Sequence, residues 1–237
     1  MGLREKETDR DILGDLPMFA GLELQEREAL SRCASLVLGQ TDDRLFEEGE
    51  PANGFFILRS GRVKMRKISP SGHEVVLHVA TPPNMIGCRA LTSTGTSYPA
   101  TAVCMEQVEA LRFTRDKFLQ AVSDSPDVFF GLLIDLNRRL KEIYTLQSAL
   151  MEPVEQRIAT LLLHQALPKD RELSDWRKYP LQEVKLTKSV IGSIVGTSTE
   201  TAIRILSRWK KKGLIGSERG STRVLNPEAI YEIAQGS

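Results

Sequence analysis

The chain has 237 residues, of which 41% are hydrophobic, and its formal net charge is +1. This length suits one large domain or two smaller ones with real cores. No apolar run is long enough to span a membrane, and the charged N-terminus lacks the apolar region of a signal peptide. Three cysteines without CxxC spacing argue against a disulfide framework, so we expect a cytoplasmic protein.

The N-terminal half has the pattern of an all-β domain. A short helix is predicted over residues 23–34, and short strands separated by glycines follow over 36–114. Regular short strands with turn signals between them predict a barrel or a sandwich. The expected elements are a hairpin of Phe55–Leu58 and Val63–Ile68 about Ser60-Gly61, a turn at Ser69–Gly72, a strand at Glu74–Ala80 and two strands within 101–114.

Residues 126–150 change to a helical period. Pro126 suits the first turn of a helix, and large aliphatic residues then recur at spacings of three and four with charged residues between them. Such a stripe can pack against the N-terminal domain or against a second copy of itself as a coiled coil, and we expect it to do both. The expected dimer contacts are Leu132, Leu136, Leu140, Ile143, Leu146 and Leu150.

A further helix is predicted over Val154–Ala166, directly after Pro153. We place a domain boundary near Glu152. The expected organisation is an N-terminal sensor domain at 1–125, a long helix at 126–152 and a C-terminal domain at 153–237.

Residues 186–213 predict two helices joined by a tight turn. Thr187 can cap the first helix, and Gly196 suits the left-handed conformation that ends it. Thr197 or Ser198 can cap the second helix, which Gly213 ends after three lysines. The inward stripe of the second helix is Ala202, Ile205, Leu206 and Trp209. A helix-turn-helix of this design can place its second helix in the DNA major groove.

The outward face of the second helix carries polar chemistry. Glu200 and Arg204 are four residues apart and therefore share one face. An arginine can donate two hydrogen bonds to guanine, and a glutamate can accept one from cytosine. The alternative is an ordinary surface salt bridge between these two side chains, which is common on helices.

A β-wing is predicted after the second helix. Leu214-Ile215 and Thr222–Leu225 can pair across a turn at Gly216–Gly220. Residues 185–223 carry nine basic and two acidic side chains, a charge of +7, so the rest of the chain sums to −6. A basic segment on an acidic partner domain favours DNA binding. The expected DNA contacts are Thr187, Lys188, Ser198, Thr199, Glu200, Ile203, Arg204, Arg208, Lys211, Arg219 and Arg223, with Ser221 between the wing arginines.

These parts, in this order, resemble the Crp/Fnr family of bacterial transcription regulators from roughly Leu16 to Ile230. The barrel motif is residues 56–63, FILRSGRV, and the more specific reading-helix motif is residues 200–206, ETAIRIL. The resemblance implies an α+β fold with an N-terminal β-roll (a jelly roll like that of cyclic-nucleotide-binding domains), a long dimerisation helix and a C-terminal winged helix-turn-helix.

The same resemblance implies function. It implies a homodimer without enzymatic activity or membrane contact, which binds a palindromic operator on double-stranded DNA and contacts RNA polymerase. Members with this Glu/Arg pair favour half-sites of the TGTGA or TTGAT type. Thr199 and Ile203 replace the residues that distinguish these two subgroups.

The effector site of the family departs here from its cyclic-nucleotide pattern. Cys88 replaces the glutamate that holds the ribose, Tyr98 the arginine that meets the phosphate, and Pro99 the next hydroxyl residue. Because burying an anion without a fixed cation or N–H donors is costly, cyclic AMP and cyclic GMP are not expected. Ile143 and Tyr144 on the helix favour an apolar or flat ligand. The expected effector pocket comprises Met85, Ile86, Gly87, Cys88, Arg89, Tyr98, Pro99, Thr101, Leu140, Ile143 and Tyr144.

An iron–sulfur cluster and haem, two cofactors of the family, each need particular ligand residues. An iron–sulfur cluster needs four cysteines, and Cys33, Cys88 and Cys104 are too few and too widely spaced. Haem, in a sensor of NO, CO or redox state, stays open because the roll holds residues able to serve as axial ligands. These residues are His73, His78, Met85, Cys88 and Cys104. The alternative is that the methionine and Cys104 belong to the core and the histidines to the surface.

In the expected mechanism, an effector shifts the packing of two long helices and thereby rotates the DNA-binding domains. Two other kinds of function stay open beside this mechanism. The first is a regulatory, small-molecule-binding subunit of an enzyme. Against it, the chain has no phosphate-binding glycine loop and no HExxH or GxSxG motif. The second is a regulator without any ligand, controlled by its abundance.

Overall fold

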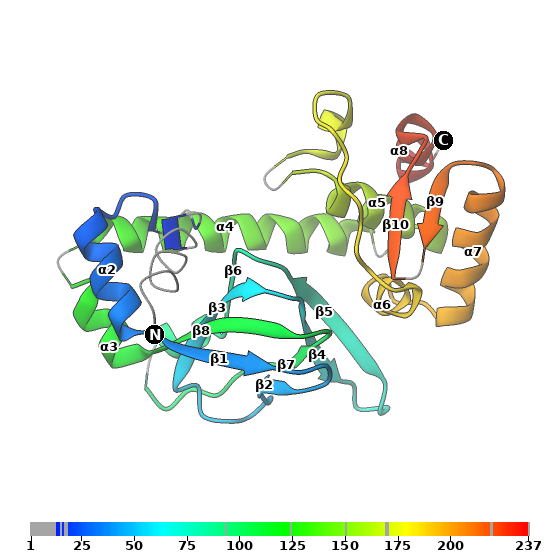
Figure 1. Ribbon diagram of the computed structural model, residues 1–237. Coiled ribbons are helices and arrows are strands. Elements are labelled where there is room, and N and C mark those ends of the chain that lie inside the picture. Colours follow the sequence, from blue (N-terminus) through cyan, green and yellow to red (C-terminus); the bar gives the residue numbers. More distant parts are fainter. Residues whose placement is uncertain are drawn as a thin grey trace. The chain divides into compact units, whose positions relative to one another are not determined.

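The computed structural model describes residues 13–14, 16, 19–92, 94–123, 125–149, 151–168, 171–218 and 220–236, without the side chains of Glu142, Leu146 and Ala149. The chain divides into two compact units, Met1–Asn137 and Arg138–Ser237. The long helix α4 (Pro126–Ala149) includes residues of both units (Figure 1). No helix within the described ranges is long and apolar enough to cross a membrane.

Two four-stranded antiparallel sheets form the β-roll of the N-terminal unit. The first sheet has the strand order β1-β8-β3-β6, and the second has the order β2-β7-β4-β5. Helices α2 (Leu24–Cys33) and α3 (Arg115–Ala121) and the short 3₁₀ helix η2 (Cys88–Leu91) complete the unit. The strands are β1 (Ser35–Gly39), β2 (Arg44–Phe46), β3 (Gly54–Ser60), β4 (Val63–Ile68), β5 (Glu74–Ala80), β6 (Asn84–Ile86), β7 (Thr101–Cys104) and β8 (Val108–Thr114).

Strand β3 is buried on both faces and separates two hydrophobic cores. Successive side chains of a strand point to opposite faces, so Phe55 and Ile57 join the core under the helices, whereas Phe56 and Leu58 join the core between the sheets. All four are at most 3% exposed. On the helical side the Phe55 ring stacks on a β8 phenylalanine with centroids 5.1 Å apart, and Phe118 of α3 meets it edge-on at 4.9 Å.

The predicted hairpin of β3 and β4 is wrong. Strand β3 pairs with β6 and β8, and β4 pairs with β5 and β7, so the chain passes from one sheet to the other at Ser60–Val63. The physical reason is that both edges of β3 are already paired within its own sheet. Gly61 makes the crossing with φ 78°, and a Cβ there would lie 2.2 Å from the carbonyl oxygen of Gln107.

The other predicted β elements are confirmed. At the turn over Ser69–Gly72, the Ser69 N–H donates to the His73 carbonyl at 2.8 Å. The following strand spans Glu74–Ala80, and two strands lie within residues 101–114. The predicted helix over 23–34 is α2, one residue shorter at each end.

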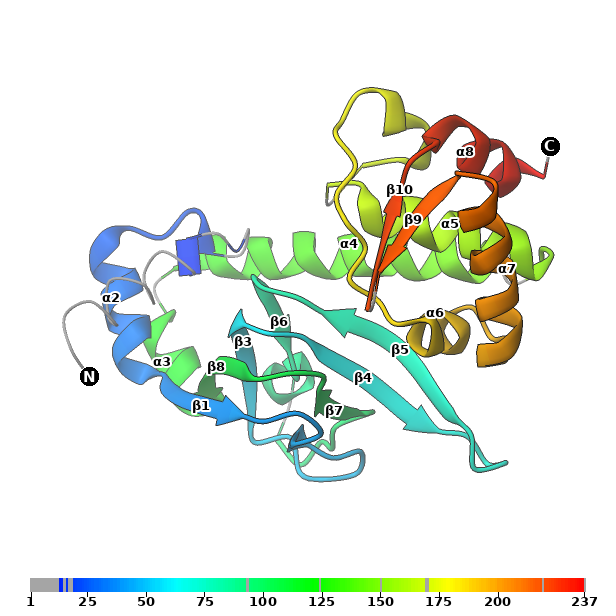
Figure 2. The same cartoon turned by 45° about the vertical axis from the view of Figure 1, so that its right-hand side comes forward.

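The C-terminal unit is a winged helix-turn-helix, and Figure 2 shows its helices α5 to α8 with the two wing strands β9 and β10. The wing strands β9 and β10 are antiparallel. Gly216 pairs with Arg223, so β9 continues to Glu218 and the wing turn is shorter than the predicted Gly216–Gly220. The elements are α5 (Val154–Ala166), η3 (Leu173–Arg177), α6 (Lys188–Ile194), α7 (Thr199–Lys211), β9 (Ile215–Glu218), β10 (Ser221–Val224) and α8 (Pro227–Gln235).

The helix ends of the helix-turn-helix follow the predicted chemistry. The Thr187 hydroxyl accepts from the Val190 N–H at 3.3 Å at the start of α6. Ser198, rather than Thr197, caps α7 by accepting from the Thr201 N–H at 3.2 Å. Gly196 between the helices has φ 66°, the left-handed conformation that glycine adopts without strain.

Gly61→Ala should destabilise the β-roll more than Gly72→Ala. Both glycines have φ near 80°, so both substitutions carry the left-handed penalty of about 1–2 kcal/mol. Only at Gly61 does the new Cβ meet backbone, whereas Gly72 has nothing within 4 Å. We expect an additional loss of about 1–3 kcal/mol at Gly61, measured by urea unfolding. Equal losses at the two positions would show that the crossing is not sterically constrained.

Candidate DNA interface and ligand cavity

One face of α7 presents polar side chains to solvent. Ala202, Ile205, Leu206 and Trp209 are all at most 6% exposed, and they form the predicted inward stripe. Residues advance by about 100° around a helix, so Glu200, Arg204 and Lys211 fall on the opposite side. All three are exposed, and Ser207 lies on the same stripe. Sequence reasoning left Ser207 out, although its spacing from Arg204 and Lys211 placed it there.

The Glu200 carboxylate is held at the start of α7. Hydrogen bonds from its own backbone N–H and from the Ser198 hydroxyl lower the pKa of this carboxyl. These partners belong to the helix cap and do not include Arg204. The Glu200 carboxylate is therefore bound by the helix cap and not by the salt bridge to Arg204 that was the alternative.

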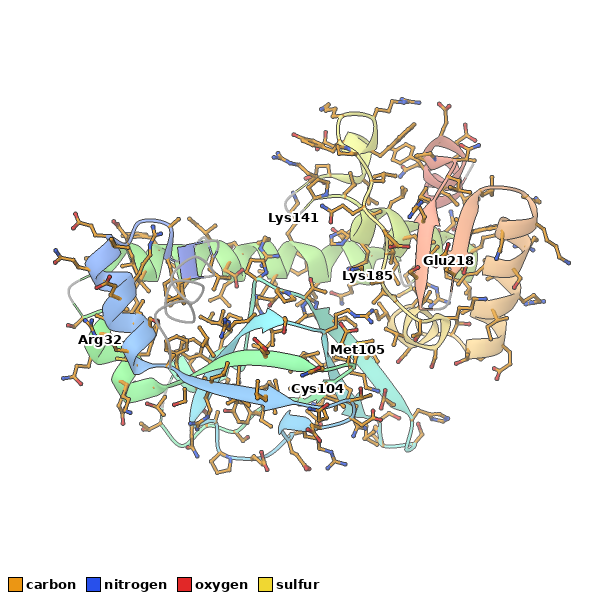
Figure 3. The ribbon with its side chains drawn as sticks, in the orientation of Figure 1. Arg32, Cys104, Met105, Lys141, Lys185 and Glu218 are labelled. Atoms are coloured by element: carbon orange, nitrogen blue, oxygen red, sulfur yellow. The ribbon has the colours of Figure 1, made fainter. Side chains whose placement is uncertain are left out.

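A groove of about 550 Å³ lies between the start of α6, the start of α7 and the wing. It brings together Thr187, Lys188, Thr199 and Ile203, four residues of the expected DNA contacts. The wing side of the groove consists of Ser217, Glu218, Gly220, Ser221 and Thr222. Figure 3 labels Lys185, in the segment before α6, and Glu218 at the end of β9. The groove thus joins the reading helix and the wing into one surface.

Of the two arginines expected in the wing, the structure describes Arg223. Arg223 is exposed, and its guanidinium lies 4.0 Å from the Glu183 carboxylate. Arg219 lies outside the described residues. Glu183 also accepts from the Ser221 hydroxyl at 2.8 Å, so this carboxylate contacts two residues of the wing strand β10.

Arg208 is engaged by α5 rather than pointing freely outward. Its guanidinium pairs with Glu155 at 2.5 Å, and the buried Trp209 indole N–H donates to the same carboxylate at 2.7 Å. Burial opposes ionisation of Glu155, but the hydrogen bonds from Trp209 and Arg208 outweigh it and lower the pKa of this carboxyl. Glu155 therefore holds the C-terminal half of α7.

A second α5 side chain holds the turn of the helix-turn-helix. The Arg157 guanidinium donates to the Val195 carbonyl at the end of α6, at 2.6 Å. Glu155 and Arg157 together fix the reading helix and the turn before it. Sequence reasoning missed both, because no local spacing links α5 to residues about 40–50 positions later.

The predicted effector residues of the roll do not form one pocket. Ile86 and Tyr98 belong to the core between the sheets, whereas Met85 and Cys88 belong to the core under the helices. The reason is strand alternation in β6. Gly87 borders the inter-sheet core and Pro99 is exposed. The hydroxyl of Thr101 is occupied by the Glu48 N–H at 3.0 Å.

The space between the sheets is filled by aromatic rings. Tyr98 stacks on Phe46 with ring centroids 4.0 Å apart, and its hydroxyl donates to the Gly54 carbonyl at 2.5 Å. Burial raises the pKa of the Tyr98 hydroxyl. Tyr98 stands where the cyclic-nucleotide pattern has an arginine, so the phosphate partner is replaced by a packed, neutral ring.

A cavity of about 390 Å³ lies on the helix-facing side of the first sheet (β1-β8-β3-β6), between η2, α3 and the first half of α4. Three expected effector residues line it, namely Met85, Cys88 and Arg89. The remaining lining residues are Leu91, Thr92, Phe118, Leu119, Phe129, Leu132, Asp135 and Leu136. Most of the wall is apolar, and its polar residues are Arg89 and Thr92, which are exposed, and Asp135, which is buried.

The five candidate haem ligands lie in different parts of the roll. Of the five candidate ligands only Met85 and Cys88 line the cavity. His73 is exposed in the β4–β5 turn beside the Ser71 hydroxyl, and His78 lies on β5. Cys104 (Figure 3) is fully buried between the sheets, and burial raises the pKa of its thiol. No group of three or more His, Cys, Asp or Glu within the described part of the chain has the arrangement of a metal site.

The long helix exposes a broad apolar stripe. Four side chains between 55% and 64% exposed lie on it: Phe130, Leu133, Ile134 and Tyr144. The expected dimer contacts omitted all four. Of those that were expected, Leu136, Leu140 and Ile143 are 43–58% exposed, Leu132 and Leu136 line the cavity, and Leu150 and the Leu146 side chain lie outside the described residues. The expected contacts stay a prediction, and the exposed apolar stripe adds neighbouring positions to them.

The expected effector residues on the helix are also exposed. Leu140, Ile143 and Tyr144 lie in the C-terminal unit and are 43–60% exposed. Between them, Lys141 of α4 (Figure 3) forms an ion pair with Glu172, which precedes η3 in the same unit.

Comparison with known families assigns both halves of the chain. Residues 37–125 match the family described as cyclic nucleotide-binding domain, and residues 156–233 match the Crp-like helix-turn-helix domain. The chain belongs to the Crp/Fnr family of transcription regulators. Its α+β fold of β-roll, long helix and winged helix-turn-helix is the Crp/Fnr fold, and Crp/Fnr proteins are regulators rather than enzymes.

Individual Crp/Fnr proteins resemble nearly the whole chain. The "CRP-like cAMP-activated global transcriptional regulator" of Mycobacterium tuberculosis is 27% identical over 233 residues, 95% of this chain and 99% of that protein. The "Cyclic AMP receptor protein" of Thermus thermophilus is 26% identical over 93% of this chain and 97% of its own length. The solved structure of FixK2 from Bradyrhizobium japonicum has a TM-score of 0.70 at 20% identity, over 84% of this chain and 96% of that one.

Glu155→Ala should destabilise the C-terminal unit, and Glu155→Gln should do so less. Alanine leaves the buried Trp209 N–H without its acceptor, which costs about 1–3 kcal/mol. Glutamine keeps an acceptor and loses only the half-exposed pair with Arg208, worth at most about 1 kcal/mol.

Acid should reduce the difference between the wild type and Glu155→Gln. The pKa of Glu155 is lower in the folded state, so its stabilisation is present above the unfolded pKa and is lost as pH falls through the folded pKa. Thermal unfolding between neutral and acid pH measures this, and a constant difference would contradict the assigned pair.

Proposed function

We propose that the protein is a homodimeric, sequence-specific DNA-binding regulator in which α7 enters the major groove. The observation that carries this proposal is the exposed polar stripe of α7, which lies opposite a fully buried apolar stripe. We propose residues 1–125 as the sensor domain, 126–152 as the dimerisation helix and 153–237 as the DNA-binding domain.

Base recognition is assigned to the first two turns of α7. The Arg204 guanidinium is free to donate two parallel hydrogen bonds to guanine, and Glu200, ionised at neutral pH, can accept from the cytosine amine. Thr199 and Ile203 line the groove next to these two residues and offer a hydroxyl and an apolar contact. A thymine methyl group is the natural partner of the Ile203 side chain.

Phosphate contacts are assigned to the edges of the same surface. Lys188 lies at the start of α6, and Lys211 lies at the end of the α7 stripe. Arg223 on β10 and Thr187 complete the set on the described residues. Such contacts fix the orientation of the domain on the duplex and carry no sequence information themselves. Arg208 contributes less than expected, because Glu155 already pairs with it.

Dimerisation is assigned to the outward stripe of α4. Phe130, Leu133, Ile134 and Tyr144 expose a continuous apolar face that a second copy of the helix would cover. Two copies would then present two reading helices to half-sites one DNA turn apart, which matches a palindromic operator. RNA polymerase is proposed as the further partner of the DNA-bound dimer.

The input is proposed to be a ligand other than a cyclic nucleotide. Tyr98, Phe46 and Gly54 fill the region where the cyclic-nucleotide pattern requires a phosphate partner. The relatives named for cyclic AMP therefore share the fold and the output with this chain, and the proposed difference lies in the sensor. An iron–sulfur cluster would need more cysteines than the three of the chain, and of the candidate haem ligands Met85 and Cys88 line the cavity.

Arg204→Ala should lower the specific affinity for the operator by about 1–3 kcal/mol, because it removes a bidentate base contact. Lys211→Ala should weaken binding to all duplexes about equally and reduce the slope of log affinity against log salt by about 1. Binding measured with operator and scrambled DNA at several salt concentrations separates the two. If Arg204→Ala leaves specific affinity unchanged, α7 is not the reading helix.

Ile134→Glu should dissociate the dimer. The substitution would place two carboxylates in the covered stripe, at a cost of about 2 kcal/mol or more, which raises the dissociation constant more than tenfold. Gln120→Glu on exposed α3 adds the same charge and should leave the mass in sedimentation equilibrium unchanged. A stable Ile134→Glu dimer would exclude this stripe as the interface.

A further inference from the structure

We propose that the cavity between η2, α3 and α4 binds a small amphipathic carboxylate, with its apolar body inside and its carboxylate at Arg89. The identification of this molecule as the effector rests on the proposed function. The binding event itself requires only the N-terminal unit, since every lining residue lies between Met85 and Leu136.

The cavity lies on the helix-facing side of the first sheet. Met85 is 1% exposed and belongs to the core under the helices, together with Phe118 of α3. The other face of that sheet meets the inter-sheet core, which the Phe46–Tyr98 stack occupies. A ligand of this protein therefore has room behind η2 and not between the sheets.

The size and wall of the cavity define the body of the ligand. A volume of about 390 Å³ falls within the range of small-molecule sites, roughly 300–1,000 Å³. At about 30 Å³ for each water-sized group, it holds roughly 13 non-hydrogen atoms. Leucine, phenylalanine, methionine and cysteine side chains make most of the wall. A medium-length hydrocarbon or a substituted aromatic ring fits this description, because apolar surface gains by leaving water.

The charge at the margin defines the head group. Arg89 lines the cavity and is exposed, and within the described residues it takes part in hydrogen bonds only through its backbone carbonyl. Asp135 is the one acidic residue in the wall, and it is 6% exposed. Because most of the wall is apolar, desolvating an anionic group inside is costly, whereas the exposed guanidinium can bind it at the margin. A carboxylate there gains charge-assisted hydrogen bonds, which arginine can make in a bidentate manner.

The ligand would touch α4 on a face of its own. With about 100° between residues, Phe129, Leu132 and Leu136 cluster on the cavity side, and Phe130 and Ile134 point well away from it. Val128 and Gly131 form the buried side. Filling the cavity therefore presses on the helix that carries the proposed dimer stripe and leaves Phe130 and Ile134 of that stripe uncovered.

Isothermal titration calorimetry with decanoate tests the head group and the body together. We expect one decanoate per chain, binding about tenfold weaker to Arg89→Gln and unchanged for Arg32→Gln, an exposed arginine on α2 (Figure 3). Decanol should bind wild type and Arg89→Gln equally, and decyltrimethylammonium should bind wild type more weakly than decanoate does. No decanoate binding, or equal binding of decanoate to wild type and Arg89→Gln, overturns the proposal.

Two further measurements test the location. Thr92→Trp places a large side chain in the cavity from its exposed rim and should abolish decanoate binding, whereas Thr94→Trp, an exposed neighbour outside the wall, should not. Decanoate should also slow maleimide labelling of Cys88 and leave labelling of Cys33 unchanged, both thiols being half-buried. Circular dichroism verifies that both tryptophan variants fold. Equal effects at the two threonines, or equal protection of both thiols, place the ligand elsewhere.

These outcomes separate the inference from the proposed function. The titrations contain no DNA, so loss of operator binding in Arg204→Ala leaves decanoate binding intact. If decanoate binds as described but never changes operator affinity, the cavity is a ligand site and its role as the effector site is excluded.

Discussion

The N-terminal unit depends on one strand that is buried on both faces. Strand β3 gives Phe56 and Leu58 to the space between the sheets and Phe55 and Ile57 to the helices. Its two edges pair with β6 and β8, so it does not pair with the strand that follows it, and the chain crosses to the second sheet at Gly61. The two cores that result differ in packing. The core between the sheets contains the Phe46–Tyr98 stack, and the core under the helices borders the cavity behind η2.

The C-terminal unit depends on α5 in a comparable way. Apolar burial sets the inward stripe of α7, but two charged α5 residues fix where that helix lies. Glu155 binds Trp209 and Arg208, and Arg157 binds the Val195 carbonyl in the turn. Since α5 follows α4 after only a few residues, the polar contacts of α5 join the chain after the long helix to the reading helix and its turn.

The sequence predicted where helices and strands lie better than it predicted which strands pair with one another. Helical period and capping residues located α5, α6 and α7 within a residue or two, because these signals are local. Strand pairing is not local, and the adjacent positions of β3 and β4 suggested a hairpin, whereas both edges of β3 pair with the distant strands β6 and β8. The same alternation separated Met85 from Ile86, which a single predicted pocket had joined. On α4 the period located Leu136, Leu140 and Ile143 on an exposed face, but the full width of that face could not be known before the buried side, with Val128 and Gly131.

The DNA surface was predicted with similar limits. The amphipathic pattern of α7 was sufficient to place Glu200 and Arg204 on the outward face, and it also contained Ser207. It could not reveal that Arg208 is already paired, since Glu155 is more than 50 residues away.

The arrangement of α4 also bears on how such regulators diverge. Its cavity side, with Leu132 and Leu136, and its outward side, with Phe130 and Ile134, use different positions of one helix. Substitutions that reshape the cavity therefore need not alter the outward stripe, and the reverse also holds. With the cavity as the proposed ligand site and the stripe as the proposed subunit contact, a lineage could change its ligand and keep its subunit contact, so that one scaffold acquires many inputs.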